Sequence, residues 1–460
     1  MLKYNYRKYF KEDFMRENKF GKQKFTVLLL FGMIGQIAWS VENMYFNLFV
    51  FNTISPNLEA VTLMVQLSGV MATVATLFAG TISDKLANRR SFMSWGYVIW
   101  GLSVALFGFI SVENTMKILS TTESRAITVT LAVVIIGDCI MTLFGSSAND
   151  AAFNAWVTDN TQKENRGRIE GVIAILPLLA MLIVAGGFGI LVEAIGYKML
   201  FLTLGILISA CGVFGVFYIK DKEGLEKNGS VKDIFYGFKP SVIKNHPTFY
   251  VSLILILIYG VACQIFMPYL IIYMQQYLSF SVLEYSIIFG AAIVLGAIVN
   301  LFLTRLSDKK DKVSMLYFAS AIMSAGLFGM YFTRGIGKVG LLILFGVFGF
   351  VMITGYILVS ALCGSVMRDH TPKDDVGKLQ GVRMVFAVLI PMLVGPMIGN
   401  AINKTRNIPL PDLSSADSMT TQYIPAPEIF LAGAIVTLIM VALIPILKRL
   451  VKEKKDDTCD

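Results

Sequence analysis

Residues 159–172 read DNTQKENRGRIEGV, and residues 369–382 read DHTPKDDVGKLQGV. The two segments align without a gap, and one Asp, one Thr, one Lys, two Gly and one Val are identical between them. A shorter match precedes each segment, because Ser83-Asp84-Lys85 in the first half returns as Ser307-Asp308-Lys309 in the second. The chain is therefore built from two similar halves repeated in the same direction.

The composition places both halves in a membrane. Of the 460 residues, 55% are hydrophobic and only 15% are charged, whereas a soluble domain carries about 25% charged residues. About 20 apolar residues cross the hydrocarbon core as a helix, so each apolar run counts as one crossing. We count twelve runs, at 25–51, 59–82, 92–112, 126–157, 169–193, 198–219, 249–277, 283–304, 314–333, 338–366, 377–402 and 427–447. This pattern predicts an all-α integral membrane protein with twelve transmembrane helices in two six-helix bundles.

The basic residues give the orientation. Of the 40 Lys and Arg, 32 fall in the two ends of the chain and in the loops that follow the second, fourth, sixth, eighth and tenth runs, with Lys378 at the edge of the eleventh run counted with the loop before it. Since cytoplasmic loops are enriched in Lys and Arg, both termini are expected in the cytoplasm. The net charge of +9 is then a result of topology, which argues against a nucleic-acid partner. The expected parts are a basic N-terminus (1–24), a first bundle (25–220), a central loop (221–247), a second bundle (248–447) and a cytoplasmic tail (448–460).

The loop between the second and third helices has a recognisable pattern. Residues 80–90 read GTISDKLANRR, which resembles the loop signature of the major facilitator superfamily, although Ala87 stands where that family usually has Gly. Two parallel repeats are also a property of these transporters. The charged residues are expected to latch the two bundles at the cytoplasmic side, and plain topogenic charge is the alternative. The expected gate comprises Asp84, Lys85, Arg89, Arg90, Asp308, Lys309 and Arg383.

Within that superfamily, one branch is the most similar. Asp150-Ala151-Ala152-Phe153, Ala155–Asp159 and Gln36-Ile37-Ala38-Trp39 resemble the glycoside–pentoside–hexuronide:cation symporters and the related sucrose:proton symporters. The resemblance implies cation-coupled transport of a sugar. The sodium-coupled members carry two acids in helix 2, where this chain has Ala72 and Thr76. The sucrose transporters carry an Arg in helix 4, where this chain has Asn154.

Three acids lie well inside apolar runs, away from their ends, and intramembrane acids are functional candidates because their burial is costly. They are Glu42 in helix 1 and Asp138 and Asp150 in helix 4. Helix 4 also carries Thr142, Ser146 and Asn154, so its polar residues recur every four positions as one slowly drifting stripe. Such a stripe is expected to face a wet cavity, and hydrogen bonding that holds the helices together is the alternative.

Two of the acids are expected at one depth. At 1.5 Å per residue, Glu42 lies roughly 27 Å above Lys24, and Asp138 lies roughly 31 Å above Asp159. Two carboxylates in a low-dielectric site repel each other, so one of them is expected to hold a proton. This arrangement predicts a proton-coupling site formed by Glu42, Asp138 and Asp150. Asp150 lies lower, about 13 Å above Asp159.

The substrate candidates are polar or aromatic residues of helices 1, 4, 7 and 10. Aromatic faces stack on sugar rings while amides and carboxylates bind hydroxyl groups. For Tyr273 the interfacial aromatic belt is the alternative. The predicted set is Gln36, Asn43, Asn47, Ser146, Asp150, Asn154, Tyr269, Tyr273, Gln276 and Tyr356.

Together these patterns predict a secondary transporter of the cell membrane that takes up a glycoside or another small sugar by proton-coupled symport. Export of a hydrophobic drug, peptide or lipid-like solute is the second hypothesis, since 23 Met residues favour an apolar cavity. A receptor or scaffold on the same fold is a third. We expect a monomer whose partners are the solute, a coupling cation and lipid. We expect no enzymatic activity, cofactor or metal, because the chain has only two His residues and no nucleophile–base set.

Overall fold

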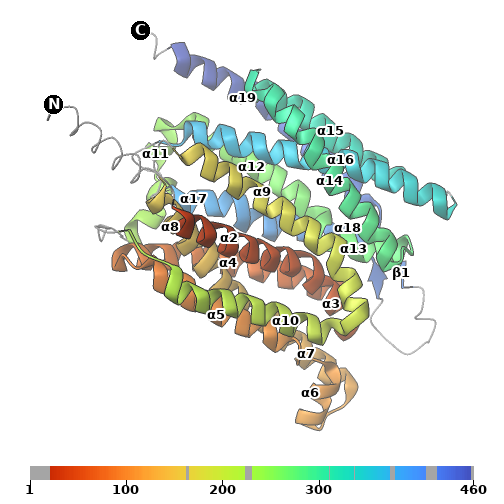
Figure 1. Cartoon of the computed structure of the whole chain (residues 1–460). Helices are drawn as coiled ribbons and strands as arrows, with labels where there is room; N and C mark the ends of the chain where they lie inside the picture. Colours follow the sequence, from red (N-terminus) through yellow and green to blue (C-terminus); the bar gives the residue numbers. More distant parts are fainter. Residues whose placement is uncertain are drawn as a thin grey trace.

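The computed structural model describes residues 21–161, 165–222, 231–309, 311–335, 337–372, 379–410 and 422–456. The first expected bundle is made of helices that run back and forth across the molecule (Figure 1). Its elements are α2 (Lys22–Val41), η1 (Glu42–Phe46), α3 (Asn47–Phe49), η2 (Val50–Ile54), α4 (Leu58–Leu86), α5 (Arg89–Phe107), α6 (Val112–Leu119), α7 (Glu123–Gly145), η3 (Ser146–Phe153), α8 (Asn154–Asn160), α9 (Arg166–Ile183), η4 (Val184–Phe188) and α10 (Gly189–Tyr218).

Two short helices follow in the expected central loop, η5 (Val231–Phe238) and α11 (Pro240–Asn245). The second bundle comes next, with two strands of two residues each before its last helix. Its elements are α12 (Pro247–Phe266), η6 (Met267–Tyr269), α13 (Leu270–Ile272), η7 (Tyr273–Tyr277), α14 (Val282–Lys309), α15 (Lys312–Phe332), α16 (Lys338–His370), α17 (Gln380–Met384), η9 (Val385–Leu389), α18 (Ile390–Arg406), β1 (Ile408–Pro409), β2 (Tyr423–Ile424) and α19 (Glu428–Asp456).

The start of α2 and the end of α19 lie at the same end of the bundles (Figure 1). We call this the terminal end, where α2 begins and α4 ends, and we call the opposite end, where α4 begins and α18 ends, the distal end. The parts of the chain outside the described residues include most of the expected basic N-terminus, part of the central loop and the end of the tail.

The described residues contain ten helices long and apolar enough to cross a membrane, or eleven if α5 and α6 count as one bent span. One of the ten, Gly171–Tyr218, has 48 residues, which at 1.5 Å per residue is about 72 Å and more than twice a hydrocarbon core of about 30 Å. It is interrupted at Gly196, whose φ of 72° and ψ of 163° are not helical. The count of twelve remains a prediction, and this break supports it.

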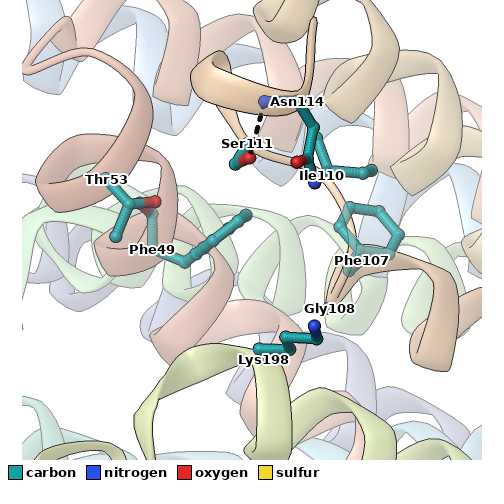
Figure 2. Close-up of a pocket in the computed structure, with 8 residues that line it drawn as sticks. All are labelled: Phe49, Thr53, Phe107, Gly108, Ile110, Ser111, Asn114 and Lys198. Atoms are coloured by element: carbon teal, nitrogen blue, oxygen red, sulfur yellow. Dashed lines mark hydrogen bonds between the residues drawn. The ribbon is translucent and has the colours of Figure 1, made fainter. Parts of the chain in front are cut away.

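The third predicted helix differs from expectation. Its helical part ends at Phe107 rather than at residue 112, and the chain then turns by 84° into the short helix α6. Ser111 caps α6 by accepting a hydrogen bond from the Asn114 amide, which explains why the chain starts a new helix there. The turn forms one wall of a cavity at the distal end (Figure 2).

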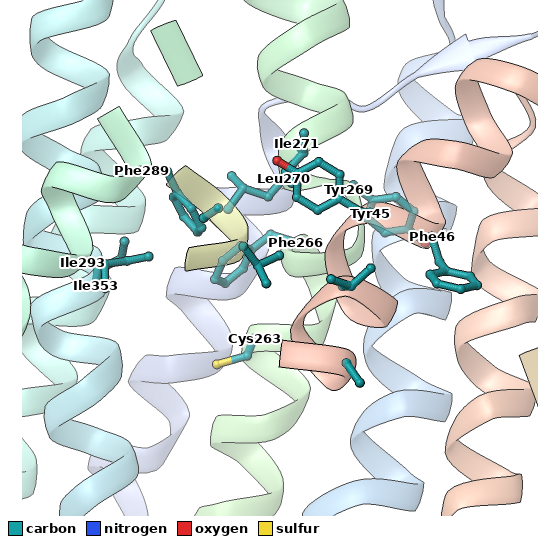
Figure 3. Packing of buried hydrophobic residues seen from close by; sticks show 14 of the residues in the cluster. Tyr45, Phe46, Cys263, Phe266, Tyr269, Leu270, Ile271, Phe289, Ile293 and Ile353 are labelled. Atoms are coloured by element: carbon teal, nitrogen blue, oxygen red, sulfur yellow. The ribbon is translucent and has the colours of Figure 1, made fainter. Parts of the chain in front are cut away.

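Aromatic and β-branched side chains fill the centre of the molecule (Figure 3). Tyr45 and Phe46 come from the first bundle, while Phe266, Tyr269 and Phe289 come from the second, and all five are buried. Helices also approach closely where both partners are small. A Cβ atom on Gly101 of α5 would lie 2.4 Å from the carbonyl of Gly205 in α10, so this crossing depends on the absence of side chains.

Ala87 is the residue where the superfamily usually has Gly, and its backbone explains that preference. It ends α4 with φ of 50° and ψ of 39°, in the left-handed region. A side chain in this region costs roughly 1 kcal/mol or more, and glycine avoids that cost.

We predict that Ala87→Gly stabilises the protein by up to about 1 kcal/mol and raises its melting temperature in detergent. The matched control is Ala132→Gly, at an exposed position inside α7, which is expected to destabilise by about 1 kcal/mol. A fall in melting temperature for both variants would contradict a relief of strain at Ala87.

Candidate functional site

Glu42 and Asp138 meet in the interior of the first bundle, as their predicted depths required. Both side chains are buried, with 8% and 1% exposed. Thr142 donates a hydrogen bond of 2.9 Å to Glu42 Oε1. Ser68 of α4 donates to Asp138 Oδ2 and lies 3.4 Å from Glu42 Oε1. Its hydroxyl is 3.1 Å from that of Thr142, so two hydroxyl groups join the two acids into one cluster.

No basic group offsets these acids among the described residues. The charged groups that act on Glu42 are Asp138 and Asp150, which are both acidic. The second oxygen of each carboxyl, Glu42 Oε2 or Asp138 Oδ1, is buried and has no hydrogen-bond partner in the part of the chain that the structure describes. Because an unpaired buried charge is very costly, this cluster is the strongest functional feature of the bundle.

Local helix geometry positions these residues. Glu42 opens the π-helical turn η1, and Ser146 and Asp150 lie in the longer π-helical stretch η3. π-Helical turns are rare and often mark functional sites. Because each such turn holds more residues than an α-helical turn, η3 reverses part of the drift of a repeat of four. Thr142, Ser146 and Asp150 therefore follow the helix axis more closely than an α-helix would allow.

The polar stripe on the fourth predicted helix, which comprises α7, η3 and α8, becomes more accessible towards the terminal end. Asp138, Thr142 and Ser146 are buried, Asp150 is half-buried and Asn154 is exposed. The Asp150 carboxyl lies beside the Ser146 hydroxyl and the Trp39 indole, and it interacts electrostatically with Arg383 of α17. The structure thus brings Asp150 close to a cation of the opposite bundle, while the Glu42–Asp138 pair stays closed to solvent.

Arg383 is exposed although it lies on a helix that faces the first bundle. Its guanidinium contacts the Gln380 side chain at 3.4 Å and interacts with Asp150 and Arg368 at longer range. None of the ion pairs found among the described residues includes Arg383. It is therefore placed to attract an anionic group or to pair with Asp150.

The predicted residues of the first helix, which comprises α2, η1, α3 and η2, are of two kinds, accessible and buried. Gln36 is half-buried and Asn43 is exposed, so both remain substrate candidates. Asn47 is 1% exposed, and its amide donates to the carbonyl of Asn43 in its own helix. Asn47 therefore does not reach a solute in this conformation.

The seventh and tenth predicted helices, which contain α12 and α16, contribute a tyrosine pair. Tyr356 is half-buried, and its ring centroid lies 5.7 Å from that of Tyr259. The Tyr259 hydroxyl donates to the Tyr356 carbonyl at 3.2 Å. Gln264 on the same helix is also half-buried, as is the predicted Gln276 near the distal end. Tyr259 and Gln264 were outside the predicted set, although polar residues in a run as apolar as α12 were a signal for them.

Tyr269 and Tyr273 of the predicted substrate set do not face an open cavity in this conformation. Both are fully buried. The Tyr269 hydroxyl lies 2.7 Å from Thr62 Oγ1 and donates to the Pro396 carbonyl at 2.9 Å. The Tyr273 ring stacks on Tyr277 with centroids 4.8 Å apart and also packs against Phe345 and Phe430. These two side chains fill the distal part of the interior, whereas the sequence pattern predicts that they face a cavity.

Tyr269 instead belongs to a set of polar contacts between the bundles at the distal end. Gln66 of α4 donates to the Leu393 carbonyl of α18 at 2.8 Å. Asn52 donates to Gln275 at 3.2 Å, and Lys404 pairs with Glu59 at 2.7 Å. With the Thr62–Tyr269 contact, these bonds close the distal end, and we call them the distal contacts.

The expected latch differs from the structure. Arg89 pairs with Asp84 and, at 3.0 Å, with Asp159, while the Arg90 amide donates to Asp221 at 2.9 Å. All of these partners belong to the first bundle or its final loop, so the motif ties α4, α5 and α8 together and does not bridge the bundles here. Lys85 is exposed, and the side chains of Asp308 and Lys309 lie outside the described residues.

The second half has an equivalent ion pair, and we call the ion pairs of each half a tie. Lys312, at the start of α15, pairs with Asp369 at 2.7 Å, and Asp369 is the sequence equivalent of Asp159. The two ties differ in burial. The Arg89 side chain is 8% exposed, whereas those of Lys312 and Asp369 are 37% and 51% exposed.

We predict that Asp159→Asn destabilises the protein by about 1.5–3 kcal/mol, because buried Arg89 loses one of its two acidic partners. Asp369→Asn at the equivalent position is expected to cost less than about 1 kcal/mol, since its pair is exposed. Thermal unfolding of the two variants in detergent checks this order, and equal losses would show that burial does not set the cost.

We predict that Tyr269→Phe loosens the distal contacts by about 1 kcal/mol, which corresponds to about a fivefold rise in the open population. The readout is labelling of Asn43→Cys by a membrane-impermeant maleimide added from the side that the distal end faces. Tyr423→Phe is the control, because its hydroxyl binds Asn400 within the second bundle at 2.9 Å. Equal labelling in both variants would argue against a closing role for Tyr269.

Known proteins share this architecture. A variant of the nucleoside transporter NupG has a TM-score of 0.65 at 12% identity, with 92% of this chain and 99% of that chain covered. A bacterial homologue of the human lysosomal transporter Spinster, in an inward-facing and unoccupied conformation, has a TM-score of 0.63 at 14% identity, with 93% and 97% covered. These structures share the fold.

Sequence comparison agrees with the fold. A multi-drug resistance efflux pump PmrA homologue from Lactococcus lactis subsp. lactis (strain IL1403) is 23% identical over 316 residues, which are 66% of this chain and 75% of that protein. The family model of the Major Facilitator Superfamily matches residues 28–396. These residues cover most of the chain and both halves of the repeat, so this multi-pass membrane protein belongs to the Major Facilitator Superfamily of transporters.

Proposed function

We propose that the protein is a proton-coupled secondary transporter of a small glycoside and that Glu42 and Asp138 carry the coupled proton. The observation that carries this proposal is the buried cluster of two carboxyls and two hydroxyls, which has no basic neighbour within the described ranges. Two ionised carboxylates that both contact the same hydroxyl group in a dry interior repel each other strongly. The cluster is far less costly when it holds at least one proton.

The hydroxyl groups favour a proton that is shared rather than fixed. Ser68 contacts both acids and Thr142, so one added proton has several hydrogen-bonded positions. Loss of that proton leaves two charges that only two hydroxyls stabilise. Proton release is therefore favoured by a conformation in which water reaches the cluster, and this links protonation to the opening of the bundles.

The proposed path for the solute follows the accessible residues towards the terminal end. Asp150 offers carboxyl oxygens and Gln36 offers a side-chain amide. Asn154 and Asn43 offer their side-chain oxygens, because their amide nitrogens donate to backbone carbonyls at 3.0 and 2.8 Å. The Tyr259–Tyr356 pair offers aromatic surface on the opposite bundle. This combination suits a ring with hydroxyl groups, which includes sugars and nucleosides.

The charge distribution assigns the two ends. With both termini in the cytoplasm, as the basic loops predict, the distal contacts close the outer side. The structure then corresponds to an inward-facing conformation, in which the Arg89 tie stays inside its bundle. Closure of the cytoplasmic side is proposed to bring Arg383 onto Asp150.

The test is uptake into proteoliposomes of labelled monosaccharides, disaccharides and nucleosides under an imposed proton or sodium gradient. For one proton per solute, a gradient of one pH unit supports about tenfold accumulation by the parent. Glu42→Gln and Asp138→Asn are expected to abolish accumulation and to keep solute exchange within about threefold. Glu123→Gln, an exposed acid on the same helix as Asp138, is the control and is expected to accumulate normally.

Accumulation by both acid variants would show that the coupled proton lies elsewhere. Uptake driven by sodium alone would contradict proton coupling. Uptake of none of these solutes under either gradient would move the weight to the second candidate.

That second candidate is export of a hydrophobic drug, peptide or lipid-like solute. The efflux-pump relative favours it, because 66% of this chain is aligned with that protein. The same acid cluster would then exchange a proton for the solute. Efflux of a fluorescent apolar dye from cells separates the candidates, since an exporter lowers dye retention and loses that activity in Glu42→Gln.

A further inference from the structure

A cavity distinct from the acid cluster lies at the distal end of the first bundle. Its volume is about 230 Å³. Figure 2 shows Phe49 and Phe107 on two sides of this space, with Ser111 and Asn114 on one side and Lys198 opposite them. The other lining residues are Thr53, Gly108 and Ile110. The cavity therefore combines aromatic walls with one ammonium group.

The protein surface next to this cavity is apolar. Leu102 and Leu106 of α5 are 56% and 64% exposed, and Phe109 after that helix is 50% exposed. Ile118 and Leu119 of α6 are 79% and 51% exposed. Because α6 turns by 84° from α5, it runs along the membrane surface if α5 crosses the bilayer. This surface is thus continuous with the face that contacts acyl chains.

Lys198 supplies the charge of the cavity. Its ammonium lies 5.2 Å from the centroid of the Phe109 ring, and none of the ion pairs found among the described residues includes it. The nearest acid of α6, Glu113, pairs with Lys117 instead. The Asn114 side chain donates to the Phe109 carbonyl at 2.8 Å, so this amide is occupied and helps to hold the wall in place.

We propose that this cavity binds the headgroup of an anionic phospholipid from the leaflet at the distal end. The phosphate lies against Lys198 and the Ser111 hydroxyl, and an acyl chain follows Phe109, Leu106 and Leu102. A volume of about 230 Å³ equals the share of roughly eight water molecules, which is room for a phosphate with part of its glycerol. A charge-assisted bond to Lys198 gives the preference for an anionic headgroup.

The position of the cavity gives this lipid a role in conformational balance. Phe49 and Thr53 flank Asn52, which donates to Gln275 of the second bundle. A lipid that packs against this segment braces the helix that carries one of the distal contacts. Binding is therefore expected to favour the conformation with a closed distal end, whatever solute is transported.

The test is thermal unfolding of the purified full chain in detergent, titrated with phosphatidylglycerol or with phosphatidylcholine. The parent is expected to gain more stability from phosphatidylglycerol. Lys198→Gln is expected to raise the half-saturating phosphatidylglycerol concentration about fivefold, while Lys198→Arg stays near the parent. Lys117→Gln removes an exposed charge of α6 outside the cavity and is the control that keeps the parental response.

Two further arms identify the ligand. Native mass spectrometry is expected to detect one phosphatidylglycerol fewer on Lys198→Gln than on Lys117→Gln, which separates binding from general stability. Inorganic phosphate and glycerol 3-phosphate are expected not to reproduce the stabilisation. Stabilisation by either soluble anion would overturn a lipid site, as would an unchanged phosphatidylglycerol response in Lys198→Gln.

Discussion

The rest of the structure depends on two carboxylic acids that meet inside the first bundle, where the described part of the chain places no basic side chain beside them. Glu42 and Asp138 come from different helices and share the hydroxyls of Ser68 and Thr142. Full ionisation of such a pair is strongly unfavourable, so the site needs a proton or a conformational change that admits water. The protonation state of this pair can therefore affect how the surrounding helices pack. The wider turns η1 and η3 lie where these residues enter the interior, which places the local irregularity of the helices at the point of chemistry.

The contacts between the two bundles differ at the two ends of the molecule. At the distal end, Gln66, Tyr269 and Lys404 contact the opposite bundle. Towards the terminal end, Asp150, Asn154 and Arg383 become accessible, and the Arg89 and Lys312 ties stay within their own halves. We interpret this difference as one state of an alternating cycle. The proposed lipid cavity adds a third influence, because it touches the same helix segment as the Asn52–Gln275 bond.

Much of the fold followed from sequence, since apolar run length and loop charge are governed by the bilayer itself. The meeting of Glu42 and Asp138 followed from their depth along straight helices. Ser68 was missed because a lone serine in an apolar run looks the same whether it holds helices together or binds an acid. Tyr269 was assigned to the solute because a helical face does not reveal which bundle will cover it. The partners of Arg89 depended on packing between distant segments, and the turn into α6 depended on a cap at Ser111, which the apolar pattern placed inside the third predicted helix.

We infer that the Glu42–Asp138 cluster holds a proton at neutral pH. Infrared difference spectroscopy of the purified protein in H₂O and D₂O tests it most directly, with the parent compared with the Glu42→Gln/Asp138→Asn double variant. A protonated carboxylic acid band is expected in the parent that shifts in D₂O and is missing from the double variant, even though Asp150 is retained. A parent spectrum with the same protonated carboxyl bands as the double variant would contradict it, since both acids would then be ionised.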